Sequence, residues 1–200
     1  MESKIYFQPF VGKDYANGGI FGKRIMVLGE SHYITDDSGS PSFTNEIVNW
    51  HLDPKKPRSN PFLRTFVKFE RTLIGEDADQ EERVKIWNSL LFYNYLQVPM
   101  GGPREAGTFD DYQQAAAPFY EVIERYQPEH IIVWGYRLWD HLPRERWEDG
   151  ESNVVNGTSV PTGYYTMTNG KKVKVLAMYH PSSPAYEKAF WHRVISEFLK

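Results

Sequence analysis

The sequence predicts an α/β fold of three layers, an α/β/α sandwich in which helices cover both faces of a central, mostly parallel four-stranded sheet. The prediction rests on short apolar runs that end in glycine or polar residues and alternate with segments of helical spacing. Such runs are typical of strands that are buried on both faces, as in parallel sheets. The runs are Ile25–Leu28, Leu90–Tyr93, His130–Trp134 and Val173–Met178.

The length and composition limit the kinds of protein that this sequence can encode. A chain of 200 residues without linker, repeat or low-complexity tract is expected to form a single domain over residues 1–200. The absence of cysteine excludes disulfides, iron–sulfur clusters with thiolate ligands and cysteine nucleophiles. We expect no metal and no cofactor, because the histidines do not have the spacing of metal ligands.

The sequence also bears on location and partners. The amino terminus lacks the pattern of a signal peptide and no apolar run is long enough to span a bilayer, so we expect a cytoplasmic protein without a membrane partner. The net charge of −3 gives no general attraction to nucleic acid, although a local basic face would still allow it. We expect a monomer.

The first third of the chain should surround the first strand. Residues 1–22 contain four glycines and scattered aromatic residues, and we expect them to wrap the sheet. The polar segment Asp36–Ser42 resembles the loops that often form lids beside a site. A short helix is expected at Phe43–Trp50. Ser59-Asn60-Pro61 is a helix-start signal, and apolar residues at helical spacing extend that helix to about Leu73.

Helix signals continue through the middle of the chain. An acidic helix is expected from Asp79 to Trp87. Thr108, three residues before Asp111, has the pattern of a capping box and predicts a helix to about Arg125. Pro118 should kink or split this helix.

The last third should contain two helices and a hairpin. A short helix at Tyr136–Leu142 follows the third strand, and the mostly polar residues 143–159 are expected to be exposed. Asn169-Gly170 is a strong turn signal and predicts a hairpin over Tyr164–Met178. A helix at Ala185–Leu199 closes the chain.

Polar residues follow three of the predicted strands. They are the loop Gly29–Tyr33, then Asn94, then His180–Ser183. Because the carboxyl ends of parallel strands lie at one edge of a sheet, where open α/β sheets bind their ligands, these three groups should converge. The sequence therefore predicts an active or binding site at that edge.

The same three groups resemble, in this order, the motifs of the uracil-DNA glycosylase superfamily. The first motif is the Gly-led loop Gly29–Tyr33, the second is the strand end Leu91-Phe92-Tyr93-Asn94, and the third is the loop His180-Pro181-Ser182-Ser183. Val133-Trp134-Gly135 also resembles the strand-ending Trp-Gly of the principal branch of that family. The resemblance covers the chain from Arg24 to the terminal helix and implies a uracil-DNA glycosylase-like fold and excision of a base from DNA.

The resemblance implies a role for each matching residue. Asn94 would hydrogen-bond the base, because an amide offers both a donor and an acceptor to a pyrimidine edge. His180 would stabilise negative charge on the departing base. Ser182 and Ser183 would contact the phosphate next to a flipped nucleotide. The aromatic residues that would wall the pocket and stack on the base are Tyr33 and Phe43.

The first loop departs from the principal branch of the family. There its third residue is an Asp that orients water and supports the sugar cation, whereas this chain has Ser31, which carries no charge. Glu30 is the nearest carboxylate and is expected to orient water or stabilise the sugar cation. Ser31 and His32 are further catalytic candidates, and Gly29 should let the backbone approach a ligand. No bulky apolar residue follows the third motif, where the family has a leucine that pushes the base out.

Two alternatives remain open from the sequence. A serine hydrolase would use Ser31 with His180, although the second glycine of the nucleophile elbow is missing. A non-catalytic protein would keep the glycosylase fold and bind a nucleobase, a nucleotide or nucleic acid. For the glycosylase and for the non-catalytic binding protein, the expected partner is DNA or a ligand that contains a nucleobase.

Overall fold

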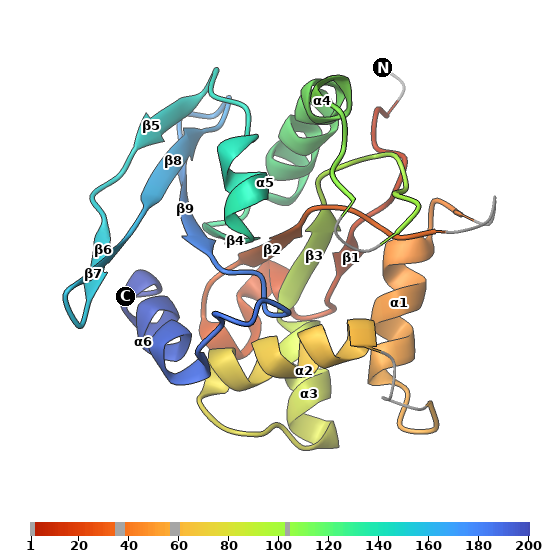
Figure 1. The fold of residues 1–200 in the computed structure, drawn as a ribbon, viewed down its shortest axis with the longest axis vertical. Helices are drawn as coiled ribbons and strands as arrows, with labels where there is room; N and C mark the ends of the chain where they lie inside the picture. The colour runs from red at the N-terminus through yellow and green to blue at the C-terminus, as the bar shows by residue number, and fades with distance from the viewer. Residues whose placement is uncertain (1–2, 35–38, 57–60, 103–104) are drawn as a thin grey trace.

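The computed structural model describes residues 3–34, 39–56, 61–102 and 105–200 (Figure 1). The predicted helix start at Ser59-Asn60 and part of the predicted loop Asp36–Ser42 lie outside the described residues. None of the helices in the described ranges is both long enough and apolar enough to cross a membrane.

The centre of the molecule is a mixed sheet of seven strands in the order β1-β3-β2-β4-β9-β8-β5. Its four inner neighbours β3, β2, β4 and β9 are parallel to one another and coincide with the four predicted apolar runs. Their bounds are Ile25–Gly29 for β2, Leu90–Asn94 for β3, His130–Trp134 for β4 and Lys172–Met178 for β9. The prediction of an α/β fold with a mostly parallel central sheet is therefore confirmed.

The predicted number of four strands is wrong, because antiparallel strands extend both edges of the sheet. β1 pairs with β3 at one edge, and β8 and β5 follow β9 at the other. Their bounds are Phe10–Val11 for β1, Trp147–Asp149 for β5 and Thr162–Thr166 for β8. The predicted hairpin around Asn169-Gly170 is confirmed as β8 and β9. β1 and β5 have two and three residues, too few for a pattern of alternation to show in the sequence.

The prediction that residues 143–159 are exposed is wrong in part. Besides β5, they contain β6 (Asn153–Val155) and most of β7 (Thr158–Val160), which pair as a separate two-stranded hairpin. Its turn residues Asn156 and Gly157 have φ values of 51° and 76°, the left-handed values that a tight two-residue turn requires. Val155 and Val160 of this hairpin are buried, so a mostly polar segment still contributes to the core.

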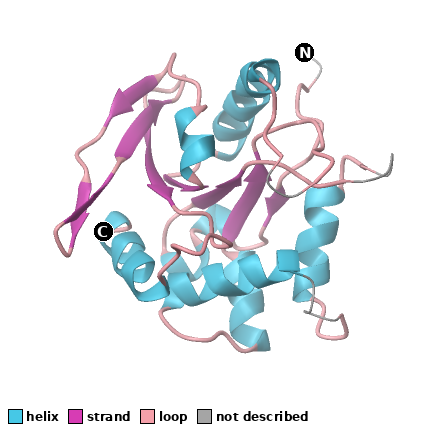
Figure 2. Cartoon of the chain, viewed as in Figure 1, coloured by secondary structure: helices cyan, strands magenta, loops and turns pink. Residues whose placement is uncertain are grey.

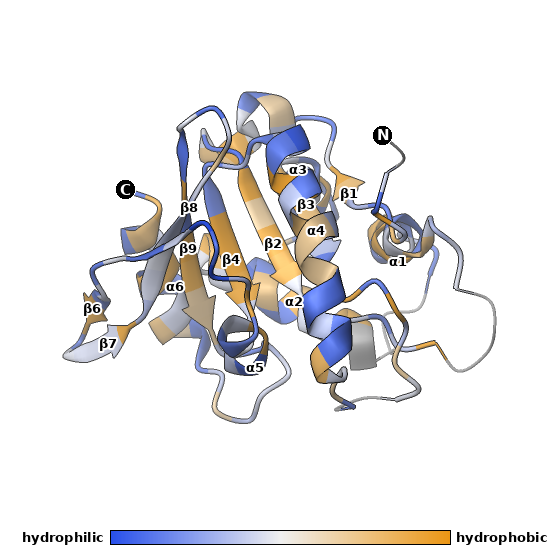
Figure 3. Ribbon diagram, turned by 90° about the horizontal axis from the view of Figure 1, so that it is seen from above, coloured by the Kyte–Doolittle hydropathy of each residue, from blue (hydrophilic) through white to orange (hydrophobic). Residues whose placement is uncertain are grey.

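Helices cover both faces of the sheet (Figure 2). α4 and α5 pack on one face, whereas α1, α2, α3 and α6 pack on the other. Successive residues of β2 alternate between these two cores, Met26 and Leu28 on the α4 side and Ile25 and Val27 on the α2 side. Figure 3 shows the resulting hydrophobic colour along β2 and β4. The helices are α1 (Phe43–Leu52), α2 (Pro61–Ile74), α3 (Gln80–Asn88), α4 (Phe109–Tyr126), α5 (Tyr136–Asp140) and α6 (Lys188–Phe198).

Every predicted helix is present. Thr108 and Asp111 form the predicted capping box at the start of α4, in which each side chain receives a hydrogen bond from the backbone N–H of the other. α4 is a single helix across Pro118, so the predicted break does not divide it. Pro118 lies on the buried side of α4, where packing on the sheet stabilises the helix despite the missing N–H.

A buried charged cluster joins three of the helices on the α2 side. The Glu70 carboxylate on α2 is fully buried and accepts hydrogen bonds from the Trp87 indole N–H at 2.8 Å and from the Arg83 Nε–H at 3.1 Å. His51 of α1 also donates to this carboxylate. One carboxylate on α2 therefore holds groups from both α1 and α3.

Replacing Glu70 by Gln should lower the free energy of unfolding by about 3–5 kcal/mol, because the Arg83 guanidinium would stay buried without a charged partner. Urea unfolding followed by circular dichroism measures this difference. The matched control is Glu81→Gln on α3, since Glu81 is exposed and pairs with Lys85 at 2.6 Å. That substitution should change the stability by less than about 1 kcal/mol. Equal small effects of the two substitutions would contradict the assigned role of Glu70.

Candidate active site

The parallel register brings the predicted motifs to one edge of the sheet. Gly29 and Asn94 are Cα partners at the carboxyl ends of β2 and β3. β4 lies between β2 and β9, and His180 comes two residues after the end of β9. All three predicted groups therefore lie at the same edge, as the sequence led us to expect.

Gly29 is needed at its position because the Asn94 side chain lies against it. A Cβ atom at Gly29 would stand 2.1 Å from Asn94 Oδ1. The predicted close approach at Gly29 is therefore made by the Asn94 side-chain amide. Asn94 itself is only 2 % exposed, and its amide is held between Gly29 on one side and the ring of His32 on the other.

The His32 side chain is enclosed by uncharged groups. Asn94 Nδ2 lies 3.1 Å from His32 Nδ1 and 3.2 Å from Nε2, and Thr44 Oγ1 lies 2.9 Å from Nε2. The rings of Phe7 and Phe43 contact the imidazole edge to face, with centroid distances of 4.9 and 5.0 Å. Burial lowers the pKa of His32 to about 3, so the ring is neutral at physiological pH.

Glu30 lies on the α4 and α5 side of the sheet edge. Arg137 of α5 donates to both of its oxygens, from Nε to Oε1 at 2.7 Å and from Nη2 to Oε2 at 2.5 Å. The Tyr112 hydroxyl of α4 donates to Oε1 as well. Only 13 % of the Glu30 side chain is exposed, and the carboxylate raises the pKa of Arg137. Such a two-point ion pair fixes the orientation of the carboxylate.

His180 is held in one tautomer by the loop that follows it. The Ser182 N–H lies 3.2 Å from His180 Nδ1, and the Ser182 hydroxyl lies 2.7 Å from the same atom. Because a backbone N–H can only donate, Nδ1 is an acceptor and the proton of the neutral ring is on Nε2. The Ser183 N–H closes the turn by donating to the His180 carbonyl at 2.8 Å. Pro181 is the second residue of this turn, a position at which proline is favoured.

The environment keeps the His180 ring neutral. The pKa of His180 is lowered to about 4, chiefly by burial and to a smaller extent by the positive charges of Arg137 and Lys68. The Glu30 carboxylate acts in the opposite direction and raises this pKa. The charge of Glu30, in the loop after β2, therefore acts on His180, in the loop after β9.

Ser31 and Tyr33, the other predicted residues of the first loop, make no side-chain hydrogen bond that links them to Glu30, His32 or His180 among the described residues. Ser31 is 7 % exposed, and its hydroxyl has no hydrogen-bond partner among the described residues. The hydroxyl that contacts His180 belongs to Ser182, so the Ser31–His180 pair of a serine hydrolase is not formed within the described part of the chain. Tyr33 is partly buried and forms a single parallel bridge with Met100.

The structure thus separates the predicted residues into two connected groups. Gly29, His32, Phe43 and Asn94 lie together on the α1 and α2 side, whereas Glu30 is bound by Arg137 and Tyr112 and its charge acts on His180. Sequence reasoning missed four contacting residues, namely Phe7, Thr44, Tyr112 and Arg137. Arg137 alone had a usable signal, because it follows Gly135 at the carboxyl end of β4.

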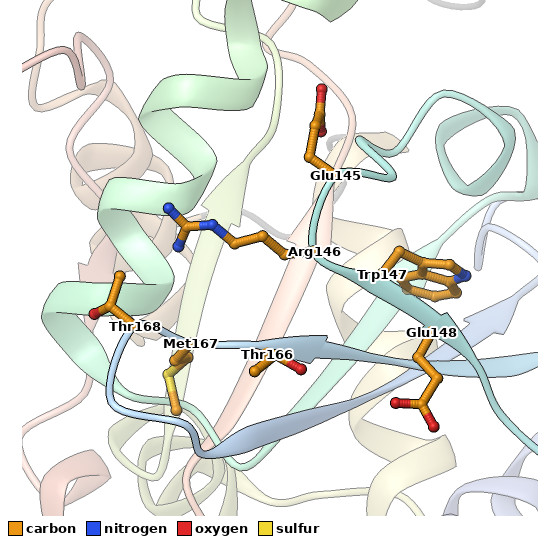
Figure 4. A pocket seen from close by; sticks show the side chains of 7 residues that line it. All are labelled: Glu145, Arg146, Trp147, Glu148, Thr166, Met167 and Thr168. Atoms are coloured by element: carbon orange, nitrogen blue, oxygen red, sulfur yellow. The ribbon is translucent and has the colours of Figure 1, made fainter.

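Two cavities lie away from this edge. One of about 490 Å³ is bordered by β5 with the residues just before it and by the end of β8 with the residues just after it. Figure 4 shows its lining residues Glu145, Arg146, Trp147, Glu148, Thr166, Met167 and Thr168. The other, of about 450 Å³, lies between the β6–β7 hairpin and α6. Within the described ranges, no three His, Asp or Glu residues gather in an arrangement that would hold a metal ion.

Comparison with known proteins adds no assignment. No family model matches the sequence, and no match was found among the curated proteins.

Replacing Gly29 by Ala should displace Asn94 and loosen the edge of the sheet, because the new Cβ would overlap Asn94 Oδ1. We expect a loss of about 1–3 kcal/mol in the free energy of unfolding. Gly102→Ala is the matched control, since a Cβ there has no neighbour within 4 Å among the residues that the structure describes. Urea unfolding of both variants measures the difference, and an unchanged midpoint for Gly29→Ala would argue against the close contact.

Proposed function

We propose that this protein hydrolyses the N-glycosidic bond of uracil, or of a related damaged base, in DNA. The observation that carries the proposal is that Asn94, Glu30 and His180 all lie at the carboxyl edge of four adjacent parallel strands. An amide, a fixed carboxylate and a neutral imidazole suit the three tasks of this reaction. These tasks are to recognise the base, to stabilise the sugar cation and to stabilise the leaving base.

The state of His180 supports its role toward the leaving base. When the bond between the sugar C1′ and the base nitrogen breaks, the bonding electron pair stays on the base and gives it a negative charge. A neutral imidazole with its proton on Nε2 can donate a hydrogen bond to a carbonyl oxygen of that base. The low pKa of about 4 makes the ring a hydrogen-bond donor rather than a charged acid at neutral pH.

The surroundings of Glu30 support a role toward the sugar. The ion pair with Arg137 and the hydrogen bond from Tyr112 hold the carboxylate in one orientation, so its charge needs no rearrangement during the reaction. The water that adds to C1′ would transfer its proton to Glu30 or to solvent. DNA is the proposed partner, and every proposed residue comes from one chain.

A labelled oligonucleotide that contains uracil tests the proposal, with alkali to cleave the abasic sites that excision leaves. The wild-type protein should yield cleaved product, and Glu30→Gln and His180→Ala should each lower the rate about 100- to 1,000-fold, the usual effect of removing one group that stabilises transition-state charge. His192→Ala on α6 is the matched histidine control, because its Nδ1 contacts the Thr72 carbonyl and not this edge. Product formation that survives both site substitutions would contradict the assigned roles.

One observation favours a second candidate, a protein that binds a nucleobase, a nucleotide or nucleic acid without cleaving it. Both Glu30 oxygens already accept hydrogen bonds from Arg137, and the position of the family's water-orienting Asp is occupied by Ser31. A binder would show a higher melting temperature with base-containing ligands and no product with uracil, hypoxanthine or mismatched substrates.

A further inference from the structure

The ring of His32 is buried among uncharged polar and aromatic side chains. It is 1 % exposed and is held by a side-chain amide, a hydroxyl and two phenyl rings, which come from three separate parts of the chain. Phe7 belongs to the amino-terminal segment, Phe43 and Thr44 begin α1, and Asn94 ends β3. Together they enclose a neutral, planar ring that contains nitrogen.

The chemistry of these groups also suits other flat aromatic rings that carry nitrogen. Phenyl edges and faces pack on any flat aromatic ring, and an amide and a hydroxyl each offer both a donor and an acceptor. The selectivity of such a site would favour heteroaromatic rings with polar atoms on one edge, because a purely hydrocarbon ring would leave the Asn94 amide without a partner. Nucleobases belong to this class.

We propose that Phe7, Phe43, Thr44 and Asn94 form a nucleobase site that the protein fills with its own His32 side chain, and that a base binds by displacing this imidazole. The inference deepens the proposed function and rests on it for the identity of the ligand. It assigns His32 the role of an internal competitor for the site.

The backbone at His32 is compatible with movement of the side chain alone. The Met100 N–H donates to the His32 carbonyl at 2.8 Å, and the Ile34 N–H donates to the Met100 carbonyl at 3.0 Å. These bonds hold the main chain on both sides of the imidazole without involving it. Phe43 is only partly buried, whereas Phe7, Thr44 and Asn94 are buried, so a base would enter beside Phe43.

Competition with His32 makes ligand binding depend on pH in a defined direction. The described groups that contact the ring carry no charge, whether they come from the amino-terminal segment, α1 or β3, and burial alone lowers the pKa of the enclosed ring to about 3. A displaced imidazole in water regains a pKa near the usual value of about 6.5. Below that pH the displaced imidazole is protonated, whereas the enclosed imidazole stays neutral. Acid therefore favours displacement of His32 and strengthens the binding of a nucleobase.

Calorimetric titration of free uracil into the wild-type protein and into His32→Ala tests this inference, since uracil keeps its charge state over the range used. Wild-type affinity should rise about tenfold between pH 7.5 and pH 5.5. His32→Ala should bind uracil more tightly than the wild-type protein at pH 7.5, with little change between the two pH values. His32→Ala combined with Asn94→Ala should lose this binding. Binding to His32→Ala that is absent, or that keeps the wild-type pH dependence, would overturn the inference.

A measurement on the wild-type protein does not depend on how well the variants fold. Nitrogen NMR of the His32 ring should report a neutral imidazole without ligand at pH 5.5 and a protonated one after uracil is added, and an unchanged ring would also overturn the inference. Uracil binding of the expected kind without base excision would contradict the proposed catalysis and leave this inference standing. Base excision without displacement of His32 would do the reverse.

Discussion

The close contact between Gly29 and the Asn94 amide is the constraint on which the candidate site depends. It arises because β2 and β3 run in parallel with these two residues in register at their carboxyl ends. Only a residue without a side chain leaves room for Asn94 Oδ1, and the amide is thereby turned toward His32. A shift of the register by one residue would exchange the faces of the sheet and separate the amide from its neighbours.

The loop after β2 links the two helical layers at this point. Glu30 is bound by α4 and α5 through Tyr112 and Arg137, whereas His32 is bound by α1 through Thr44 and Phe43. The charged residue is thus held by an ion pair, and the uncharged ring is held by burial. In the proposed reaction this division places the fixed negative charge near His180 and leaves the Asn94 side for the base.

The sequence was sufficient for the elements that depend on local patterns. Runs such as Ile25–Leu28 are buried on both faces and therefore appear as uninterrupted apolar stretches, and the capping box at Thr108 needs only residues within one turn of helix. The Asn156-Gly157 turn carried a readable signal too, but the polar residues around it concealed the short strands.

The contacts within the site could not be derived in this way. A parallel sheet predicts that the residues after its strands lie at one edge, and this reasoning would also have placed Arg137, which follows β4, at that edge. By contrast, nothing local in the sequence indicates that Phe7 contacts His32, because the two residues are 25 positions apart and β1 and β2 lie between them. Which side chain fills the space beside Asn94 is decided by packing among segments distant in sequence.

The central claim is that Asn94 and His180 act on the same base. An oligonucleotide that carries 2′-fluoro-deoxyuridine tests it directly, because the fluorine destabilises the sugar cation and slows loss of the base. In NMR titrations of the labelled protein, the Asn94 side-chain amide and the His180 ring should shift together and saturate at the same oligonucleotide concentration, with no such shifts for the thymidine counterpart. Shifts of only one of the two residues, or of neither, would contradict the account.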